Sequence, residues 1–219
     1  MALGVGSGDC VFVPDFTFFA TAEVVPEPEP EPDPVDPARI NPLSGEEMDG
    51  EYRDLRPVAV MFNNLKAAQP QLGVSRADII YEIPAEGGIT RMLGVFQTMD
   101  GVGNLGSIRS TRPYYLEAAL GHDALLVHAG GSPDAYSKIS SWSVDNMDGV
   151  NGASDAQIFW RDAQRKKNAG YEHSMVTSGE KILEYLAKVV IETRAETAAL
   201  KTEEDRLAER RRGFERKEE

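Results

Sequence analysis

The chain has 219 residues, 41% of them hydrophobic, and this length holds one domain of ordinary size together with tails. Its formal net charge of -13 is unevenly spread: residues 1–50 hold eleven acidic residues against one basic, whereas residues 51–183 hold fifteen against thirteen. Because the central part lacks the basic footprint that nucleic acid requires, a DNA or RNA partner is not expected. No apolar run reaches about 18 residues, so no membrane-spanning helix is expected.

Residues 1–50 are predicted to form a disordered, acidic, proline-rich spacer. Between Val24 and Asp36, proline alternates with glutamate or aspartate, a pattern typical of an extended and solvated segment. Cys10 is the single cysteine, which excludes an intrachain disulfide framework. Residues 1–9 contain no Lys or Arg and no apolar stretch of sufficient length, so the chain as written is expected to lack a signal peptide.

A folded domain is predicted over residues 51–188. Runs of β-forming residues between turn signals predict four strands, at residues 57–62, 77–83, 91–98 and 123–128. The short connection over residues 84–90 favours an antiparallel hairpin between the second and third of them. Capping residues and prolines near the first turn predict helices at residues 110–120 and 132–140. Further helices are predicted at residues 155–167, which end in a basic turn, and at residues 178–188, which open with Ser178. The expected fold is α+β, with a mixed, mainly antiparallel sheet and flanking helices.

Residues 189–219 are predicted to be a charged helical tail that is partly disordered. Between Leu186 and Leu207 the residues on one helical stripe follow a 4-3-4-3 spacing, but threonine and glutamate interrupt it. We favour a single exposed helix and a monomeric protein over a helix-mediated assembly built on residues 182–207.

Glu82 and Glu86 stand at the predicted hairpin, and Glu86 precedes Gly87 and Gly88. Paired carboxylates beside a flexible glycine turn can act as general acid and base or bind a cation. The alternative is a hairpin turn whose acidic side chains simply face solvent.

Arg109 and Arg112 lie three residues apart at the predicted start of a helix, with Ser110 between them. Guanidinium groups bind carboxylate and phosphate groups through paired hydrogen bonds, and a helix N-terminus adds backbone donors and a positive dipole. The segment therefore predicts an anion site. An equally good alternative is a pair of internal salt bridges to Glu82 or Glu86.

His128 ends a predicted strand and precedes Ala129, Gly130 and Gly131, where it can exchange protons near neutral pH. The alternative is a hydrogen-bonded structural histidine. His128 and Glu86 are the candidate catalytic residues, although the sequence favours a binding protein over an enzyme. The sequence contains no phosphate-binding loop and no His or Asp cluster with metal-ligand spacing, so no cofactor and no metal are expected.

Taken together, these blocks resemble the N-terminal domain of the YerB-like lipoprotein family, a domain of unknown function. The resemblance covers roughly residues 51–188 and rests on blocks that occur in the same order, at residues 56–64, 77–91, 108–114 and 128–132. It implies a bacterial, extracytoplasmic protein that is anchored to the membrane through an N-terminal lipidated cysteine and spacer. Cys10 and the acidic spacer match that layout, but the chain as written is expected to lack the signal peptide that the layout includes. The family also continues into a second domain, whereas this chain continues as a charged helix after Lys188.

From the residues and the resemblance we expect an extracytoplasmic binding or interaction module with a polar cleft for a small anionic ligand or a protein partner. The residues expected to line this cleft are Glu82, Glu86, Arg91, Arg109, Ser110, Arg112 and His128. The alternatives are an enzyme that acts on an anionic cell-envelope or small-molecule substrate, and an assembly protein that associates through its C-terminal helix.

Overall fold

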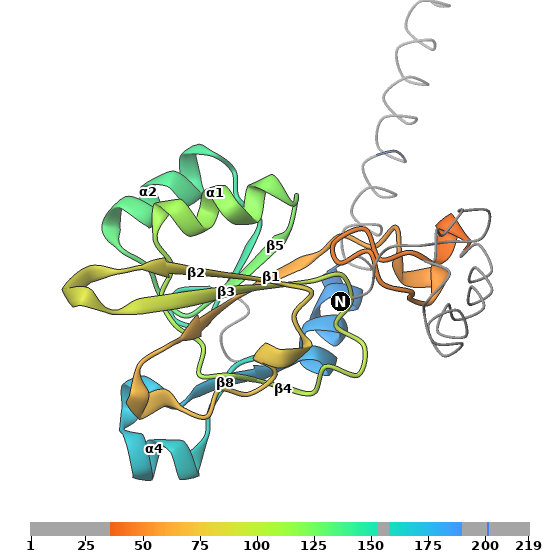
Figure 1. Ribbon diagram of the computed structural model, residues 1–219. Helices are drawn as coiled ribbons and strands as arrows, with labels where there is room; N and C mark the ends of the chain where they lie inside the picture. Colours follow the sequence, from red (N-terminus) through yellow and green to blue (C-terminus); the bar gives the residue numbers. More distant parts are fainter. Residues whose placement is uncertain (1–35, 153–157, 190–200, 202–219) are drawn as a thin grey trace, which may run out of the picture. The chain divides into compact units, whose positions relative to one another are not determined.

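The computed structural model describes residues 36–152, 158–189 and 201. A five-stranded sheet forms the centre of the compact unit that begins at Ala38 (Figure 1). Its strands stand in the order β2-β3-β1-β5-β6. Their bounds are β1 Val58–Asn63, β2 Ile79–Pro84, β3 Thr90–Phe96, β5 Leu125–His128 and β6 Asn146–Asp148.

The sheet is mixed. β2 and β3 form the predicted antiparallel hairpin, with Glu82 opposite Met92, and β3 also pairs antiparallel with β1. On the other side of β1, the pairs β1–β5 and β5–β6 are parallel. The carboxyl ends of β1, β5 and β6 therefore lie along the same edge of the sheet.

A second, antiparallel sheet packs on one face of the first, and two helices pack on the other (Figure 1). The second sheet has the order β4-β8-β7. Its strands are β4 Asn104–Gly106, β7 Trp160–Arg161 and β8 Met175–Ser178, and the helices are α1 Pro113–Gly121 and α2 Pro133–Ser141. The α+β prediction is thus confirmed.

The core lies on both faces of the five-stranded sheet, because alternate residues of its strands point to opposite sides. All six residues of β1 are buried, as expected for a strand covered on both faces. Towards α1 and α2, Met61, Leu93 and Leu116 belong to one apolar cluster. Towards the second sheet, Phe62 and Phe96 belong to another.

α2 begins as its sequence predicts, whereas α1 begins at Pro113, with Arg112 as its N-cap, three residues later than predicted. Pro113 and Pro133 occupy the first turn, where a missing backbone N–H costs nothing. The Ser132 side chain caps α2 by accepting a hydrogen bond from the Ala135 N–H at 3.1 Å. The helix predicted over residues 178–188 is also present, with residues 179–189 helical.

The helix predicted over residues 155–167 is wrong for its middle part. Trp160 and Arg161 form β7, which pairs with β8, and α4 begins only at Ala163. Asp162 separates the two elements, because its side chain caps α4 by accepting from the Arg165 N–H at 2.7 Å. Residues 155–157 lie outside the described part of the chain.

The short elements complete the described fold. They are α4 Ala163–Ala169 and the 3-10 turns η2 Pro37–Arg39, η3 Gly50–Tyr52, η4 Lys66–Ala68, η5 Val74–Arg76, η6 Glu86–Gly88 and η7 Tyr171–His173. Within residues 36–152 and 158–189, no helix is long and apolar enough to cross a membrane. The predicted spacer, most of the C-terminal tail and the 4-3-4-3 stripe lie outside the described residues.

Candidate functional site

The carboxyl ends of β1, β5 and β6 form an edge of the five-stranded sheet that we call the carboxyl edge, and the strands end there at Asn63, His128 and Asp148. After β1 the chain forms the β2–β3 hairpin on one side of that strand, and later places β5 and β6 on its other side. In open sheets with parallel strands, ligands bind outside the carboxyl ends where the strand order reverses in this way.

Three arginines come together at the carboxyl edge, and we call Arg91, Arg109 and Arg112 the arginine cluster. Arg91 lies at the start of β3, while Arg109 and Arg112 lie in the segment that leads into α1. Burial lowers the pKa of the Arg91 guanidinium, and the positive charges of Arg112 and Arg109 lower it further. Arg91 and Arg112 both donate to Ser110, Arg91 to its backbone oxygen and Arg112 to its hydroxyl, so these two guanidiniums lie close together.

The carboxylates that pair with the arginine cluster are far more exposed than the arginines. Arg112 donates from Nη2 to Glu86 Oε2 at 2.9 Å and from Nε to Glu86 Oε1. Arg109 Nη2 donates to Glu172 Oε2 at 2.9 Å. The side chains of Arg112 and Arg109 are 14% and 25% exposed, against 64% and 70% for Glu86 and Glu172. An incoming anion can thus displace either carboxylate into water without unpacking the core.

Glu86 is charged at neutral pH. The hydrogen bonds from Arg112, and then that from its own backbone amide, lower the pKa of the Glu86 carboxyl to about 2. Of the salt bridges predicted to Glu82 or Glu86, the structure forms the one between Arg112 and Glu86. Arg109 pairs with Glu172 instead.

Arg91 is the most enclosed member of the cluster, with 5% of its surface exposed. Its Nη1 donates to the backbone oxygen of Ser110 at 2.7 Å. No carboxylate among the described residues lies within 4.0 Å of this guanidinium. A carbonyl oxygen fixes the position of a guanidinium but does not neutralise it, and the Glu86 carboxylate, beyond 4.0 Å, compensates the buried charge of Arg91 only in part.

Ser110 lies inside the cluster and Glu82 lies away from it. The Ser110 hydroxyl accepts from Arg112 Nη1 at 3.4 Å, and its backbone oxygen accepts from Arg91. Glu82 is opposite Met92 in the hairpin, so it is on the sheet face that Arg91, one residue earlier on β3, does not share. Glu82 accepts hydrogen bonds from Asn64 and Thr90.

His128 is fully buried behind the loop that follows β5. Its Nδ1 is 2.8 Å from the Gly130 backbone oxygen and its Nε2 is 3.2 Å from Asn146 Oδ1. In this arrangement the ring holds the turn at Gly130, whose φ of +84° suits glycine. The structure does not place His128 on the solvent side of the carboxyl edge with the arginines.

Asp148 fixes the same loop. Its Oδ1 accepts from the amides of Gly130 and Val150 at 2.8 and 2.9 Å, and its Oδ2 accepts from the Tyr136 hydroxyl at 2.7 Å. Burial alone raises the pKa of the Asp148 carboxyl, but the hydrogen bonds from Tyr136 and Gly130 outweigh it and the pKa is lowered. Burial, together with the hydrogen bond to Asp148, raises the pKa of Tyr136 to about 12.

Sequence reasoning missed both Glu172 and Asp148. Asp148 ends a short strand and precedes Gly149, which is the same strand-end pattern that drew attention to His128 and could have identified it. Glu172 carried no such signal, because it stands in a polar turn 63 residues after its partner Arg109. Its place in the site depends on the pairing of β4 with β8, and β4 has only three residues.

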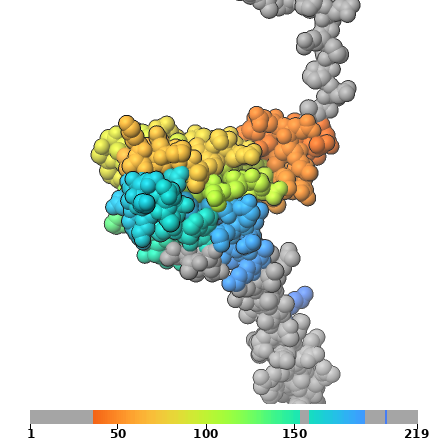
Figure 2. Space-filling model, turned by 90° about the horizontal axis from the view of Figure 1, so that it is seen from below, coloured from red at the N-terminus to blue at the C-terminus, as the bar shows by residue number. Residues whose placement is uncertain are grey.

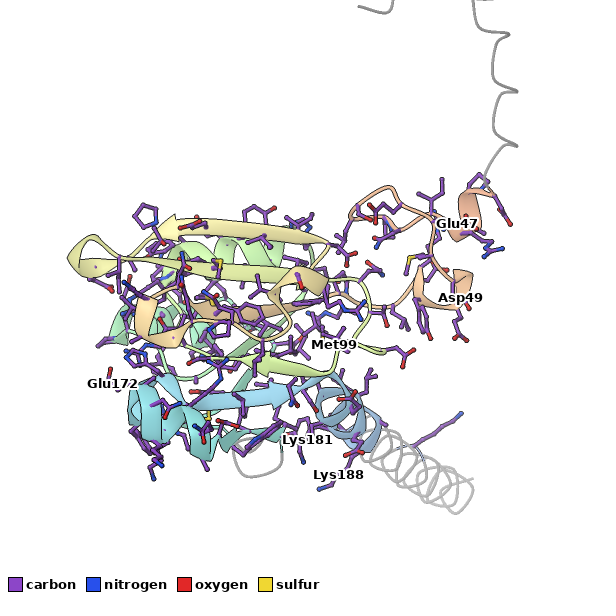
Figure 3. The ribbon with its side chains drawn as sticks, turned by 60° about the horizontal axis from the view of Figure 1, so that its bottom comes forward. Glu47, Asp49, Met99, Glu172, Lys181 and Lys188 are labelled. Carbon is purple, nitrogen blue, oxygen red and sulfur yellow. The ribbon has the colours of Figure 1, made fainter. Side chains whose placement is uncertain are left out.

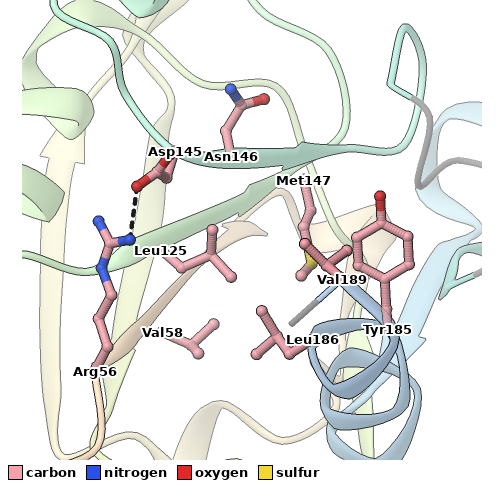
Figure 4. Close-up of a pocket in the computed structure, with 9 residues that line it drawn as sticks. All are labelled: Arg56, Val58, Leu125, Asp145, Asn146, Met147, Tyr185, Leu186 and Val189. Atoms are coloured by element: carbon pink, nitrogen blue, oxygen red, sulfur yellow. Dashed lines mark hydrogen bonds and ion pairs between the residues drawn. The ribbon is translucent and has the colours of Figure 1, made fainter. Parts of the chain in front are cut away.

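A cavity of about 390 Å³ lies at the opposite edge, beside the amino ends of β1 and β5 (Figure 4). Val58, Leu125 and Leu186 line it, and Arg56 pairs with Asp145 at 2.6 Å along its wall. None of the seven predicted cleft residues lines this cavity. Within the described ranges, no group of three or more His, Cys, Asp and Glu side chains is arranged to hold a metal ion.

The class of protein follows from a family comparison. The family described as "Protein of unknown function (DUF3048) N-terminal domain" matches residues 43–192, and the chain belongs to this family. A model of the DegT/DnrJ/EryC1/StrS aminotransferase family matches residues 1–42, of which the structure describes only residues 36–42.

Two relatives have a YerB name. The chain is 41% identical over 120 residues to "Putative lipoprotein YerB" of Bacillus subtilis (strain 168), a match that covers 55% of this chain and 35% of that protein. The crystal structure of YerB protein from Bacillus subtilis aligns with a TM-score of 0.61 at 37% identity, and covers 68% of this chain and 49% of that one. The matches thus cover about half of the crystallised chain and about a third of the curated relative. The predicted YerB-like family is confirmed.

Proposed function

We propose that this domain is a binding module for an anionic ligand, and that the arginine cluster is its binding site. The observation that carries the proposal is Arg91, a guanidinium with 5% of its surface exposed that Ser110 holds through a neutral carbonyl oxygen. Arg109 and Arg112 add two further cations whose carboxylate partners face solvent. A phosphate or carboxylate group would accept paired hydrogen bonds from these donors and would neutralise their mutual repulsion.

The enzyme alternative has less support from the geometry. His128 is enclosed behind the Gly130 loop, and Glu86 is held as a charged carboxylate by Arg112. His128 is shut off from solvent, and Glu86, although exposed, is paired with Arg112 as a carboxylate whose pKa lies far below neutral, so neither group is well suited to general acid–base catalysis at neutral pH.

Calorimetric titration with inorganic phosphate tests the proposal, because two substitutions should change the phosphate affinity in opposite directions. Glu86→Gln removes the charge that competes for Arg112, so we expect phosphate to bind about three- to tenfold more tightly. Arg109→Gln removes a donor, so we expect affinity to fall about tenfold or more. Arg56→Gln is the matched control, because Arg56 also pairs with carboxylates but lies at the opposite edge.

If the ion pairs of the arginine cluster serve only stability, the titrations give a different result. Glu86→Gln would then weaken the fold and leave phosphate affinity unchanged. No heat of phosphate binding to the parent chain at millimolar concentration, or equal affinities for the parent, Glu86→Gln and Arg109→Gln chains, would refute the anion site. Urea unfolding of each variant separates a loss of binding from a loss of structure.

We also propose that the domain is presented at the bacterial cell envelope as part of a lipoprotein. This rests on the name of the 41% identical relative, "Putative lipoprotein YerB", and on Cys10 ahead of an acidic, proline-rich segment. Fractionation of cells that express the natural gene tests it, with Cys10→Ser as the comparison. Envelope association that Cys10→Ser abolishes would support the proposal, and equal soluble distribution of both forms would contradict it.

A further inference from the structure

We propose that the anion bound at the arginine cluster is one unit of a linear polyanion whose neighbouring charges lie along η7 and α4. This inference rests on the proposed function and names the ligand class for the same site. The residues that carry it form a basic strip, which consists of Arg161, Arg165, Lys166 and Lys167. These residues belong to β7 and α4, in the layer opposite α1 and α2 (Figure 1).

The turn η7 joins the arginine cluster to the basic strip. Arg109 donates from Nη2 to the Glu172 carboxylate at 2.9 Å and from Nη1 to the Glu172 backbone oxygen at 3.5 Å. Arg161 Nη1 donates to the backbone oxygen of Tyr171, the preceding residue, at 2.8 Å. The guanidiniums of Arg109 and Arg161 thus bind two consecutive residues of η7. Figure 3 shows Glu172 beside α4.

The basic strip keeps its positive charge. No carboxylate of the described residues lies within 4.0 Å of any of its four side chains. Arg161 and Arg165 are fixed by backbone carbonyls instead, Arg165 by those of Ala68 and Pro70. These bonds hold the guanidiniums without neutralising them, as the Ser110 carbonyl does for Arg91. The strip is therefore a local concentration of positive charge on a domain whose overall balance over residues 51–183 is near neutral.

An exposed aromatic ring orders two of the cations. Tyr171 is 59% exposed, and the Arg161 guanidinium carbon lies 3.9 Å from its ring centroid. Lys166 Nζ lies 5.6 Å from the same centroid. Cations held against a ring lose less freedom when they bind an anion than free side chains do. Figure 2, seen from below, shows α4 and η7 at the surface of the molecule.

A linear polymer with phosphate groups fits this layout better than a single small anion. Its first charge occupies the arginine cluster, and its next charges meet Arg161 and Lys166 at a high effective concentration because they are covalently joined. Affinity should therefore increase with the number of linked phosphates, and should fall steeply with salt as more cations are engaged.

Titrations with inorganic phosphate and with a linear polyphosphate of about 20 units test this inference on the full chain. Expressed per phosphate unit, which removes the statistical gain of a repeating ligand, the polymer should bind at least about tenfold more tightly than phosphate. The double variant Lys166→Gln/Lys167→Gln should reduce that advantage about three- to tenfold and leave phosphate affinity unchanged. Lys138→Gln is the matched control, since its ammonium also lies over an aromatic ring, at 4.5 Å from that of Trp142, but it belongs to α2.

The outcomes separate this inference from the proposed function. If phosphate binds and the polymer binds no more tightly, or if the double variant behaves like Lys138→Gln, the polyanion is refuted and the anion site stands. Binding to phosphatidylglycerol vesicles without binding to polyphosphate refutes the polymer in favour of a membrane surface. If neither phosphate nor polyphosphate binds, the proposed function falls and this inference falls with it.

Discussion

The hydroxyl of Tyr115 should contribute measurably to stability, because it fastens α1 to both strands of the β2–β3 hairpin. Tyr115 is fully buried, and its hydroxyl donates to the backbone oxygens of Ile83 at 2.8 Å and Arg91 at 3.0 Å. Tyr115→Phe removes this oxygen and keeps the ring, so the packing of the side chain is preserved.

The magnitude follows from the two acceptors. One hydroxyl hydrogen is shared between them, so the net hydrogen bond contributes about 1 kcal/mol, and a carbonyl left buried without this donor costs about 1–3 kcal/mol. We therefore expect Tyr115→Phe to lower the free energy of unfolding by about 1–3 kcal/mol. Burial raises the pKa of Tyr115 to about 12, so the hydroxyl stays protonated and the loss should be equal at about pH 6 and about pH 9.

Urea unfolding followed by circular dichroism measures the loss, with Tyr114→Phe as the matched control. Tyr114 precedes Tyr115 on α1, and the two ring centroids are 4.8 Å apart, but its hydroxyl has no hydrogen-bond partner among the described residues. The control should change stability by less than about 0.5 kcal/mol. If Tyr115→Phe costs no more than Tyr114→Phe, the hydroxyl does not hold the hairpin and the reasoning is wrong.

Two further predictions concern the loop after β5 and the start of the 179–189 helix. Asp148→Asn should destabilise the fold by about 1–3 kcal/mol at neutral pH. Because the folded-state pKa of Asp148 is lowered, the stabilisation that its carboxylate provides is present above the unfolded pKa and is lost as pH falls through the folded pKa. The difference in unfolding free energy between the parent and Asp148→Asn, measured in urea, should therefore disappear in acid. A difference that stays constant with pH contradicts this. Gly179→Ala would place its Cβ 2.3 Å from the Met99 backbone oxygen, which should cost about 1–3 kcal/mol, whereas Gly121→Ala meets no atom within 4 Å and should leave the melting temperature unchanged or higher. Equal melting temperatures for the two alanine variants would show that the backbone at Gly179 yields.

The long elements were predictable because their local patterns agree with their tertiary environment. The apolar run at residues 57–62 became β1, and the short connection before Arg91 became the turn of the β2–β3 hairpin. Cap-then-proline order at Ser132 and Pro133 gave the start of α2. In each case the signal lies within about ten residues, and a local signal of that length is what a single sequence carries.

The short strands were not predictable because tertiary pairing alone makes them strands. Trp160 and Arg161 form a two-residue strand only because β8 is beside them, and the helical pattern around residues 155–167 hid it. The same applies to the site. The cluster of Arg91, Arg109 and Arg112 follows from hairpin and helix positions, whereas Glu172 reaches Arg109 only through the second sheet.

The ion pairs of the arginine cluster differ from ordinary surface ion pairs, because their arginines are much less exposed than their carboxylates. In the pair between Arg39 and Glu47 the two side chains are equally exposed, at 57% and 58%. In the pair between Arg112 and Glu86 the arginine is 14% exposed and the carboxylate 64%. Exposed partners contribute little to stability because water screens them, so the carboxylates offset only part of the cost of burying the guanidiniums.

The charge of Arg91 is compensated least directly, because its guanidinium hydrogen-bonds a carbonyl oxygen and the Glu86 carboxylate that attracts it lies beyond 4.0 Å. A fold selected for stability alone would remove this cost by placing a carboxylate against the guanidinium or an apolar side chain in place of Arg91. If an anion binds here, as we propose, its interaction with the guanidiniums would offset this electrostatic cost. The same logic predicts that a bound polyanion should raise the unfolding free energy more in the parent chain than in Arg91→Lys, whose ammonium cannot form the paired hydrogen bonds of a guanidinium. Equal stabilisation of the two chains would show that Arg91 is a structural residue and that the binding site lies elsewhere.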